Sequence, residues 1–88
     1  MKRVLIVYQT KKEGYHLFDL VVTPEQFGKV AACQNRYINS VDWPPECEWL
    51  AEFLDDYPCV SDSLNLSAVF PYFPTEKIDA VIVTGIVL

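Results

Sequence analysis

Seven carboxylate side chains fall between residues 42 and 62 of this 88-residue chain, and no Lys or Arg lies among them. Carboxylates can serve acid/base catalysis in a cleft, or they can present negative potential to a basic surface. Near the C-terminal end of a helix the dipole disfavours an acid by roughly 0.3–1 kcal/mol, so helix stability does not explain Asp55 and Asp56. Four of these acids share the solvent-facing side of one predicted helix: Glu48, Glu52, Asp55 and Asp56.

An acidic surface of this kind attracts a basic partner, and the electrostatic steering speeds their encounter. It can also imitate the phosphates of nucleic acid and so occupy the nucleic-acid-binding groove of a partner protein. We therefore expect a non-enzymatic protein-binding module, in its sharpest form an inhibitor of a nucleic-acid-handling protein. The alternative for the same residues is a solvated helix face that keeps the protein soluble. Direct binding of nucleic acid is opposed by the formal net charge of −5.

A short aromatic stretch that contains two prolines, residues 70–74, is the second candidate for partner binding. The prolines exclude a regular central strand, so a stiff loop is expected. If Tyr72 and Phe73 are exposed, they would act as rigid anchors, because aromatic residues are enriched in protein interfaces. The alternative is that Phe70 and Phe73 tuck under the sheet edge. The candidate partner-binding residues are thus Glu48, Glu52, Asp55, Asp56, Tyr72 and Phe73.

Signals for catalysis are weak in this sequence. His16 is the only histidine, and no motif brings a nucleophile near it, so an ordinary structural or surface role is expected. Glu48 and Glu52 share a helix face, but acid/base catalysis needs carboxylates in a cleft with perturbed pKa values. The three glycines form no phosphate-binding loop. We expect no enzymatic activity, no metal and no cofactor.

The three cysteines, Cys33, Cys47 and Cys59, are an odd number without a close pair. Their spacing supports neither a disulfide framework nor a CxxC motif, so free thiols that pack as small hydrophobic groups are expected. No apolar stretch approaches the roughly 20 residues needed to span a bilayer, and the apolar run after Met1–Arg3 is too short for a signal peptide. A cytoplasmic protein that does not bind membranes is expected.

The elements that must position these residues begin with a predicted β-hairpin, in which residues 4–8 and 15–22 flank a polar turn that ends at Gly14. Gly14 is expected to take the left-handed conformation of a three-residue loop with a bulge, because glycine does so without steric cost. One face of this ribbon then carries six large apolar side chains. The expected register pairs Val4 with Val22, Ile6 with Leu20 and Tyr8 with Phe18, and it places His16 opposite Thr10.

The second face of the hairpin is too apolar for a freely solvated sheet, so the chain or a partner is expected to cover it. The composition agrees, because 51% hydrophobic residues is a large supply for the core of a single small domain. The runner-up function is therefore a structural or assembly subunit that self-associates, for example as a homodimer, through this face or an edge strand. The apolar residues of this face are Leu5, Val7, Leu17 and Val21.

Two helices are expected after the hairpin. Residues 23–26 form a capping box, with Thr23 as N-cap and Pro24 at the first helical position, and the apolar stripe of this helix runs from Phe27 to Ile38 before Asn39–Ser40. The second helix is expected to start around residues 42–46 and to stop at Pro58. Its buried stripe comprises Trp49, Leu50, Phe53, Leu54 and Tyr57.

Two further strands complete the prediction, an edge-like strand over residues 63–68 and a central strand within residues 78–88, where Gly85 indicates a bulge or a close contact. The first and last strands are expected in the middle of the sheet, because both are apolar on both faces. The fold class is thus α+β in the order ββααββ, with a four-stranded, mainly antiparallel sheet and two helices on one face.

Overall fold

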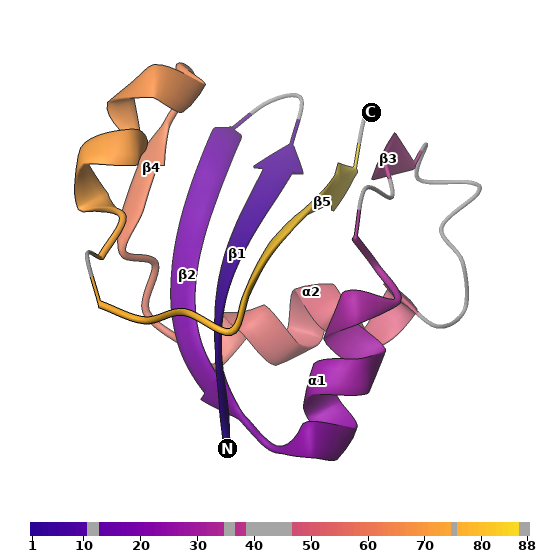
Figure 1. Ribbon diagram of the computed structural model, residues 1–88. Helices are drawn as coiled ribbons and strands as arrows, with labels where there is room; N and C mark the ends of the chain where they lie inside the picture. Colours follow the sequence, from indigo (N-terminus) through magenta and orange to yellow (C-terminus); the bar gives the residue numbers. More distant parts are fainter. Residues whose placement is uncertain (11–12, 35–36, 39–46, 75, 87–88) are drawn as a thin grey trace.

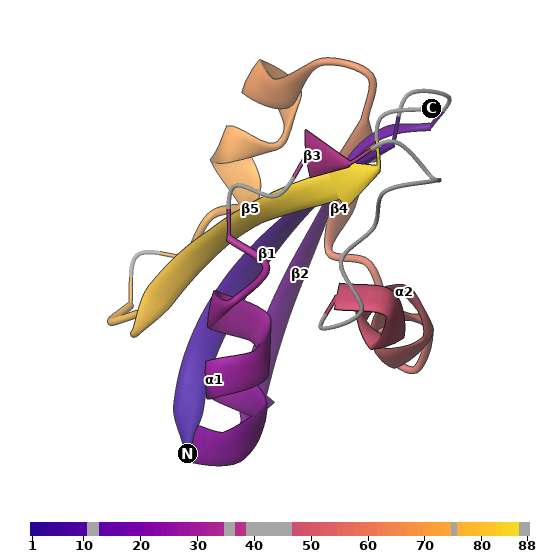
Figure 2. The same cartoon turned by 90° about the vertical axis from the view of Figure 1, so that its right-hand side faces the viewer.

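In the computed structural model, which describes residues 1–10, 13–34, 37–38, 47–74 and 76–86, five strands form one mixed sheet in the order β3-β5-β1-β2-β4. Two short helices cover one face, and two 3₁₀ turns cover the other (Figures 1 and 2). The α+β class is therefore confirmed. The elements are β1 (Lys2–Thr10), β2 (Gly14–Val22), α1 (Pro24–Ala31), β3 (Tyr37–Ile38), α2 (Glu48–Asp55), β4 (Ser61–Ser63), η2 (Leu66–Ala68), η3 (Phe70–Tyr72) and β5 (Ala80–Ile86).

The expected four-stranded, mainly antiparallel sheet in the order ββααββ is wrong. Strand β1 pairs antiparallel with β2 but parallel with β5, and β3 also pairs parallel with β5. The reason is the connection over residues 64–79, which crosses the sheet from β4 to the far side of β1 (Figure 1). A crossover of about a dozen residues or more is what a parallel pairing requires. The central positions expected for the first and last strands are confirmed, since β1 and β5 both lie inside the sheet.

The hairpin forms as expected, but its register differs by two residues. Val4 lies opposite Leu20, and Tyr8 lies opposite His16. The shift arises because Gly14, in the expected left-handed conformation with φ of 84°, itself pairs with Thr10. A shift of two residues preserves the pleat, so every side chain stays on its expected face.

The helix-facing side of the sheet carries the larger core. Val4, Ile6 and Leu20 of the hairpin are essentially buried. They pack with Val30 of α1 and Leu50 of α2, so both helices are fastened to the sheet by apolar contact.

The opposite face of the hairpin is covered by the chain itself. Leu5, Val7 and Leu17 are buried in a second cluster with Val69, which lies between the two 3₁₀ turns. This face therefore cannot serve as the predicted self-association surface. Of the residues proposed for it, Val21 is the exception, with 57% of its surface exposed.

Helix α1 begins as the sequence indicates. The Thr23 side chain accepts a hydrogen bond from the Gln26 amide, and the Gln26 side chain accepts one from the Thr23 amide, which completes the capping box. The helix ends at Ala31 and does not continue to Ile38, because Tyr37–Ile38 pair with β5 as a short strand. The closure expected at residues 39–40 lies outside the described residues.

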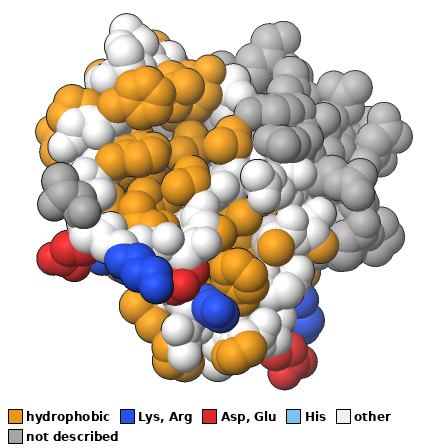
Figure 3. Space-filling view, viewed as in Figure 1, with side chains coloured by type: hydrophobic (Ala, Val, Ile, Leu, Met, Phe, Trp, Pro, Cys, Tyr) orange, Lys and Arg blue, Asp and Glu red, His pale blue; other side chains and the backbone are white. Residues whose placement is uncertain are grey.

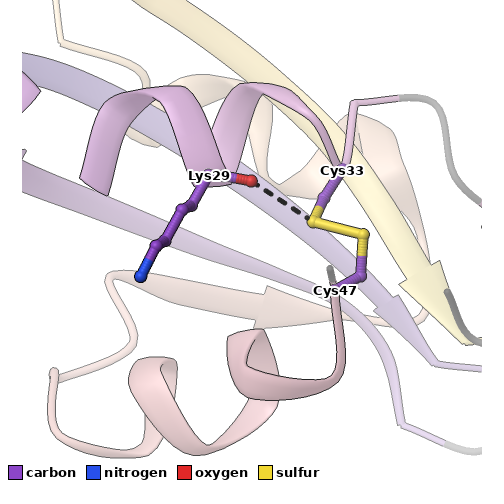
Figure 4. The surroundings of a disulfide bond; sticks show 3 residues. All are labelled: Lys29, Cys33 and Cys47. Atoms are coloured by element: carbon purple, nitrogen blue, oxygen red, sulfur yellow. Dashed lines mark hydrogen bonds between the residues drawn. A yellow bond between two sulfur atoms is a disulfide. The ribbon is translucent and has the colours of Figure 1, made fainter. Parts of the chain in front are cut away.

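A disulfide joins Cys33 to Cys47, between the end of α1 and the start of α2 (Figure 4). Their Cα atoms are 5.7 Å apart, both side chains are fully buried, and the Cys33 sulfur lies 3.6 Å from the Lys29 carbonyl oxygen. The expectation of three free thiols is wrong, and only Cys59, which is exposed, remains free. Packing of both helices on one sheet face brings together two cysteines that no local motif links. Disulfides are typical of oxidising compartments, so this bond opposes the cytoplasmic expectation.

Helix α2 buries the predicted stripe. Leu50 and Leu54 are buried, and the rings of Trp49, Phe53 and Tyr57 follow one another at centroid separations of 5.0 and 5.2 Å. The start expected at residues 42–46 lies outside the described residues. The helix ends at Asp55, with Asp56 as its C-cap and Pro58 shortly beyond.

The strand expected over residues 63–68 is wrong in its bounds. Strand β4 covers Ser61–Ser63 and does lie at the sheet edge, but Asn65 then accepts hydrogen bonds from the amide and hydroxyl of Ser67 and starts a 3₁₀ turn. Gly85 makes the expected close contact, since a Cβ atom there would meet the Gln9 backbone nitrogen at 2.8 Å. Among the described residues, no helix is long and apolar enough to cross a membrane.

Candidate partner-binding surface

The acidic residues of α2 lie on the side of the helix that faces away from the core. Glu52, Asp55 and Asp56 are all exposed, as the sequence predicts, while Leu50 and Leu54 anchor the other side. Glu48 begins the helix, but its side chain lies outside the described part of the structure. We call Glu52, Asp55 and Asp56 the acidic surface of α2.

No described cation neutralises this surface. The ion pairs found in the described part of the chain are those of Arg3 with Asp19 and Glu76; the Nε2 atom of His16 also lies 3.5 Å from a Glu13 oxygen, a contact that is ionic only with a protonated imidazole. Helix α2 also has no basic residue in its last turn, so the negative end of its dipole adds to the field of Asp55 and Asp56. The negative potential at this end of the helix is therefore uncompensated within the described structure.

Arg3 pairs with two acids elsewhere in the described part of the chain, Asp19 and Glu76. The Arg3 guanidinium donates two hydrogen bonds to the Asp19 carboxylate, at 3.0 and 2.7 Å, and one to Glu76 at 2.9 Å. The hydrogen bonds from Arg3 hold the pKa of Asp19 below its usual range, against the opposing effect of partial burial. The contrast with α2 shows that the protein does not leave all its acids unpaired.

A cavity of about 270 Å³ lies beside the acidic surface, between the hairpin end and α2. The sequence did not predict it, because the cavity depends on where α2 packs on the end of the hairpin, which no local pattern indicates. Residues of both elements line it: Tyr8, Thr10, Glu13, His16, Phe18, Ala51, Leu54 and Asp55.

Two groups in this cavity show its electrostatic character. The Nε2 atom of His16 is buried without a hydrogen-bond partner among the described residues, and it lies 3.5 Å from the Glu13 carboxylate. Burial raises the pKa of Tyr8 to about 12, with further contributions from the negative charges of Asp55 and Glu13. Asp62 of β4 is paired directly with His16, so its side chain belongs to the same sheet face. The cavity is thus a negative environment with a partly apolar wall.

The predicted aromatic residues do not join this surface. Tyr72 is 56% exposed, whereas Phe73 is half-buried against the second core cluster. Both lie at η3, over the sheet face opposite to α2 (Figure 2). They therefore belong to a separate apolar patch around η3 and β5, and Figure 3 shows hydrophobic side chains gathered on this side of the molecule with polar groups between them.

Comparison with protein-family models, curated proteins and solved structures gave no match. In the described part of the chain, no group of three His, Cys, Asp or Glu residues is arranged to hold a metal ion. Among the described residues, the acidic surface of α2 with its cavity and the apolar patch of η3 each have a defined chemical character.

Proposed function

We propose that the protein is a non-enzymatic binding module that presents the acidic surface of α2 to a basic partner protein, in its sharpest form as an inhibitor that occupies a nucleic-acid-binding surface. The observation that carries the proposal is the exposure of Glu52, Asp55 and Asp56 without a described counter-cation. Paired carboxylates would lose their existing partners on binding, whereas these are free to attract new ones.

The strength of such a contact depends on salt. Interactions between exposed charges are screened over a Debye length of about 8 Å at physiological ionic strength. An exposed ion pair contributes about 0.2–1 kcal/mol, so three together contribute roughly 0.6–3 kcal/mol, which corresponds to about a threefold to 150-fold change in affinity. An effect of this size is measurable, and high salt should abolish it.

The test is affinity capture from the native host with three forms of the protein as bait. The first is the wild type. The second, E52Q/D55N/D56N, removes three negative charges from the acidic surface. The third, A32K/Q34K/A68K, adds three positive charges at exposed positions elsewhere and so shifts the net charge equally. Ala32 and Gln34 lie just beyond α1 and Ala68 lies in η2, so none belongs to α2 and the third bait controls for net charge.

The proposal would be supported if the wild type and the lysine control both recover the same basic proteins at low salt. The neutralised bait should fail to recover these proteins. Displacement of the same proteins by duplex DNA would support the inhibitor form of the proposal. Equal recovery by the neutralised bait and the lysine control would reject the acidic surface as the docking site.

Self-association is the second candidate, and it rests on the apolar patch around η3. Phe70 and Tyr72 are each more than half exposed, and Val81 of β5 is 39% exposed. Phe70 and Val81 line a cavity of about 300 Å³, together with Val83. Sedimentation of the wild type and of F70S/Y72S separates the candidates, because a dimer that the double variant dissolves assigns self-association to this patch.

A further inference from the structure

We propose that the cavity between the hairpin and α2 receives an arginine side chain of the basic partner, so that this one residue anchors the contact made by the acidic surface. The inference rests on the proposed function and deepens it, because it names the group that the partner must present. The cavity, of about 270 Å³, is smaller than the usual range for drug-sized ligands, so a single side chain suits it better than a cofactor.

Carboxylates from two different elements border the cavity. Glu13 comes from the hairpin turn and Asp55 from the last turn of α2. Their charges reach into the site, since both contribute to the raised pKa of Tyr8. A cation in this space would lie near two negative groups that form no ion pair with a described Lys or Arg side chain.

His16 supplies a polar atom that the protein leaves unsatisfied. Its Nε2 atom is buried, lacks a hydrogen-bond partner among the described residues, and lies 3.5 Å from a Glu13 oxygen. A buried polar atom without a partner costs free energy, and a bound donor would remove that cost. In its neutral form with Nε2 unprotonated, the imidazole accepts a hydrogen bond from a guanidinium that also reaches Glu13.

The remaining wall of the cavity suits the apolar part of a long cationic side chain. Ala51 and Leu54 of α2 and Phe18 of β2 line it. The methylene stem of an Arg or Lys packs along such a surface while its charged head reaches polar groups. An aromatic face also attracts a cation that lies over it.

Arginine fits these groups better than lysine. The guanidinium is planar and carries five donors in a fixed fork, whereas the ammonium is a compact, strongly hydrated charge. The acceptors at this site come from Glu13, Asp55 and His16 and are distributed around the cavity, and an aromatic ring lies beside them. One guanidinium can stack its planar face on a ring while its five donors point outward in the plane, whereas an ammonium has three donors and no planar face to stack.

The test uses the ¹⁵N-labelled full chain and three pentapeptide probes with blocked ends, Gly-Gly-X-Gly-Gly, in which X is arginine, lysine or citrulline. Citrulline has the shape of arginine without its charge. We expect the arginine probe to shift the amide resonances of Ala51, Leu54 and Asp55, the lysine probe to bind several-fold more weakly, and the citrulline probe to leave them in place.

Two neighbouring acids provide matched variants. Asp55 lines the cavity and Asp56 does not, although both are exposed and carry the same charge. D55N should weaken binding of the arginine probe by about tenfold or more, because a charge-assisted hydrogen bond is lost. D56N should weaken it by less than about threefold, the effect of a screened surface charge. The amide spectra of both variants report whether the fold is intact.

Failure of this inference can be separated from failure of the proposed function by a hexa-arginine peptide. If D55N and D56N weaken binding of hexa-arginine equally, or if citrulline binds as well as arginine, the cavity is not the anchor and the acidic surface still docks cations. If hexa-arginine binds wild type and E52Q/D55N/D56N alike, the docking surface itself is wrong, and the anchor fails with it.

Discussion

Removal of the Cys33–Cys47 disulfide should lower the free energy of unfolding by about 3 kcal/mol. The two residues are 14 positions apart, and in the chain-entropy description a link that closes a loop of about 15 residues contributes roughly this amount. Small domains are stable by about 5–15 kcal/mol in total, so the loss is a large fraction. The corresponding fall in Tm for a domain of this size is on the order of 10–20 °C.

The measurement is urea unfolding followed by tryptophan fluorescence, with and without reductant. It should be made in a Cys59→Ser background, since an exposed third thiol would permit exchange. In this background, reductant should shift the midpoint of unfolding to lower urea. The matched control is the same chain with Cys33→Ala and Cys47→Ala, which should unfold early and be insensitive to reductant.

A thiol count provides an independent check of the same bond. The unfolded wild-type chain should show one reactive thiol without reductant and three with it. Three thiols in the unreduced chain, or equal urea midpoints with and without reductant, would refute the reasoning.

Three further perturbations test single interactions. Thr23→Ala removes the N-cap of α1 and should cost about 1 kcal/mol in urea unfolding, whereas Thr23→Ser should cost little; equal losses would contradict the capping role. Gly85→Ala places a Cβ against the Gln9 backbone and should cost about 1–3 kcal/mol or more by thermal unfolding, while Gly28→Ala, at an open helical position, should be neutral or stabilising. Arg3 lowers the pKa of Asp19 in the folded protein. The ionised Asp19 therefore stabilises the fold at pH values above about 4, the usual carboxyl pKa, and this stabilisation is lost as the pH falls through the folded-state pKa. Asp19→Asn should therefore be less stable than wild type at about pH 6, and this difference should shrink as the pH falls through the folded-state pKa of Asp19; a constant difference would contradict this assignment.

Features of the chain that depend on neighbours in sequence were predictable. The capping box at residues 23–26 and the buried stripe of α2 follow from side chains within one or two helical turns of each other. The exposure of Glu52, Asp55 and Asp56 follows from the same helical period, because the opposite side of that helix is apolar.

Features that depend on contacts between segments far apart in the sequence were not predictable. Tyr37–Ile38 continue the apolar spacing of α1, yet their pairing with Gly85–Ile86 forms a strand. The parallel position of β5 depends on a crossover that no local signal indicates. The disulfide likewise forms because two helices pack on one sheet face, at a spacing that no motif marks.

One part of the candidate site was predictable from local sequence and another part was not. The exposure of its charges follows from the helical period of α2, but its cavity depends on where α2 packs against the end of the hairpin. Tyr72 and Phe73 could help the acidic residues bind a partner only if they lay near them. Placement of η3 over the other sheet face separates these residues from α2.

The most direct measurement is an NMR titration of the ¹⁵N-labelled protein with hexa-arginine at low and at physiological salt. The acidic surface predicts that the largest amide shifts occur at Glu52, Asp55 and Asp56 and at Ala51 and Leu54 beside them, and that salt reduces them. Shifts concentrated around η3, or spread evenly over the chain, would contradict the account.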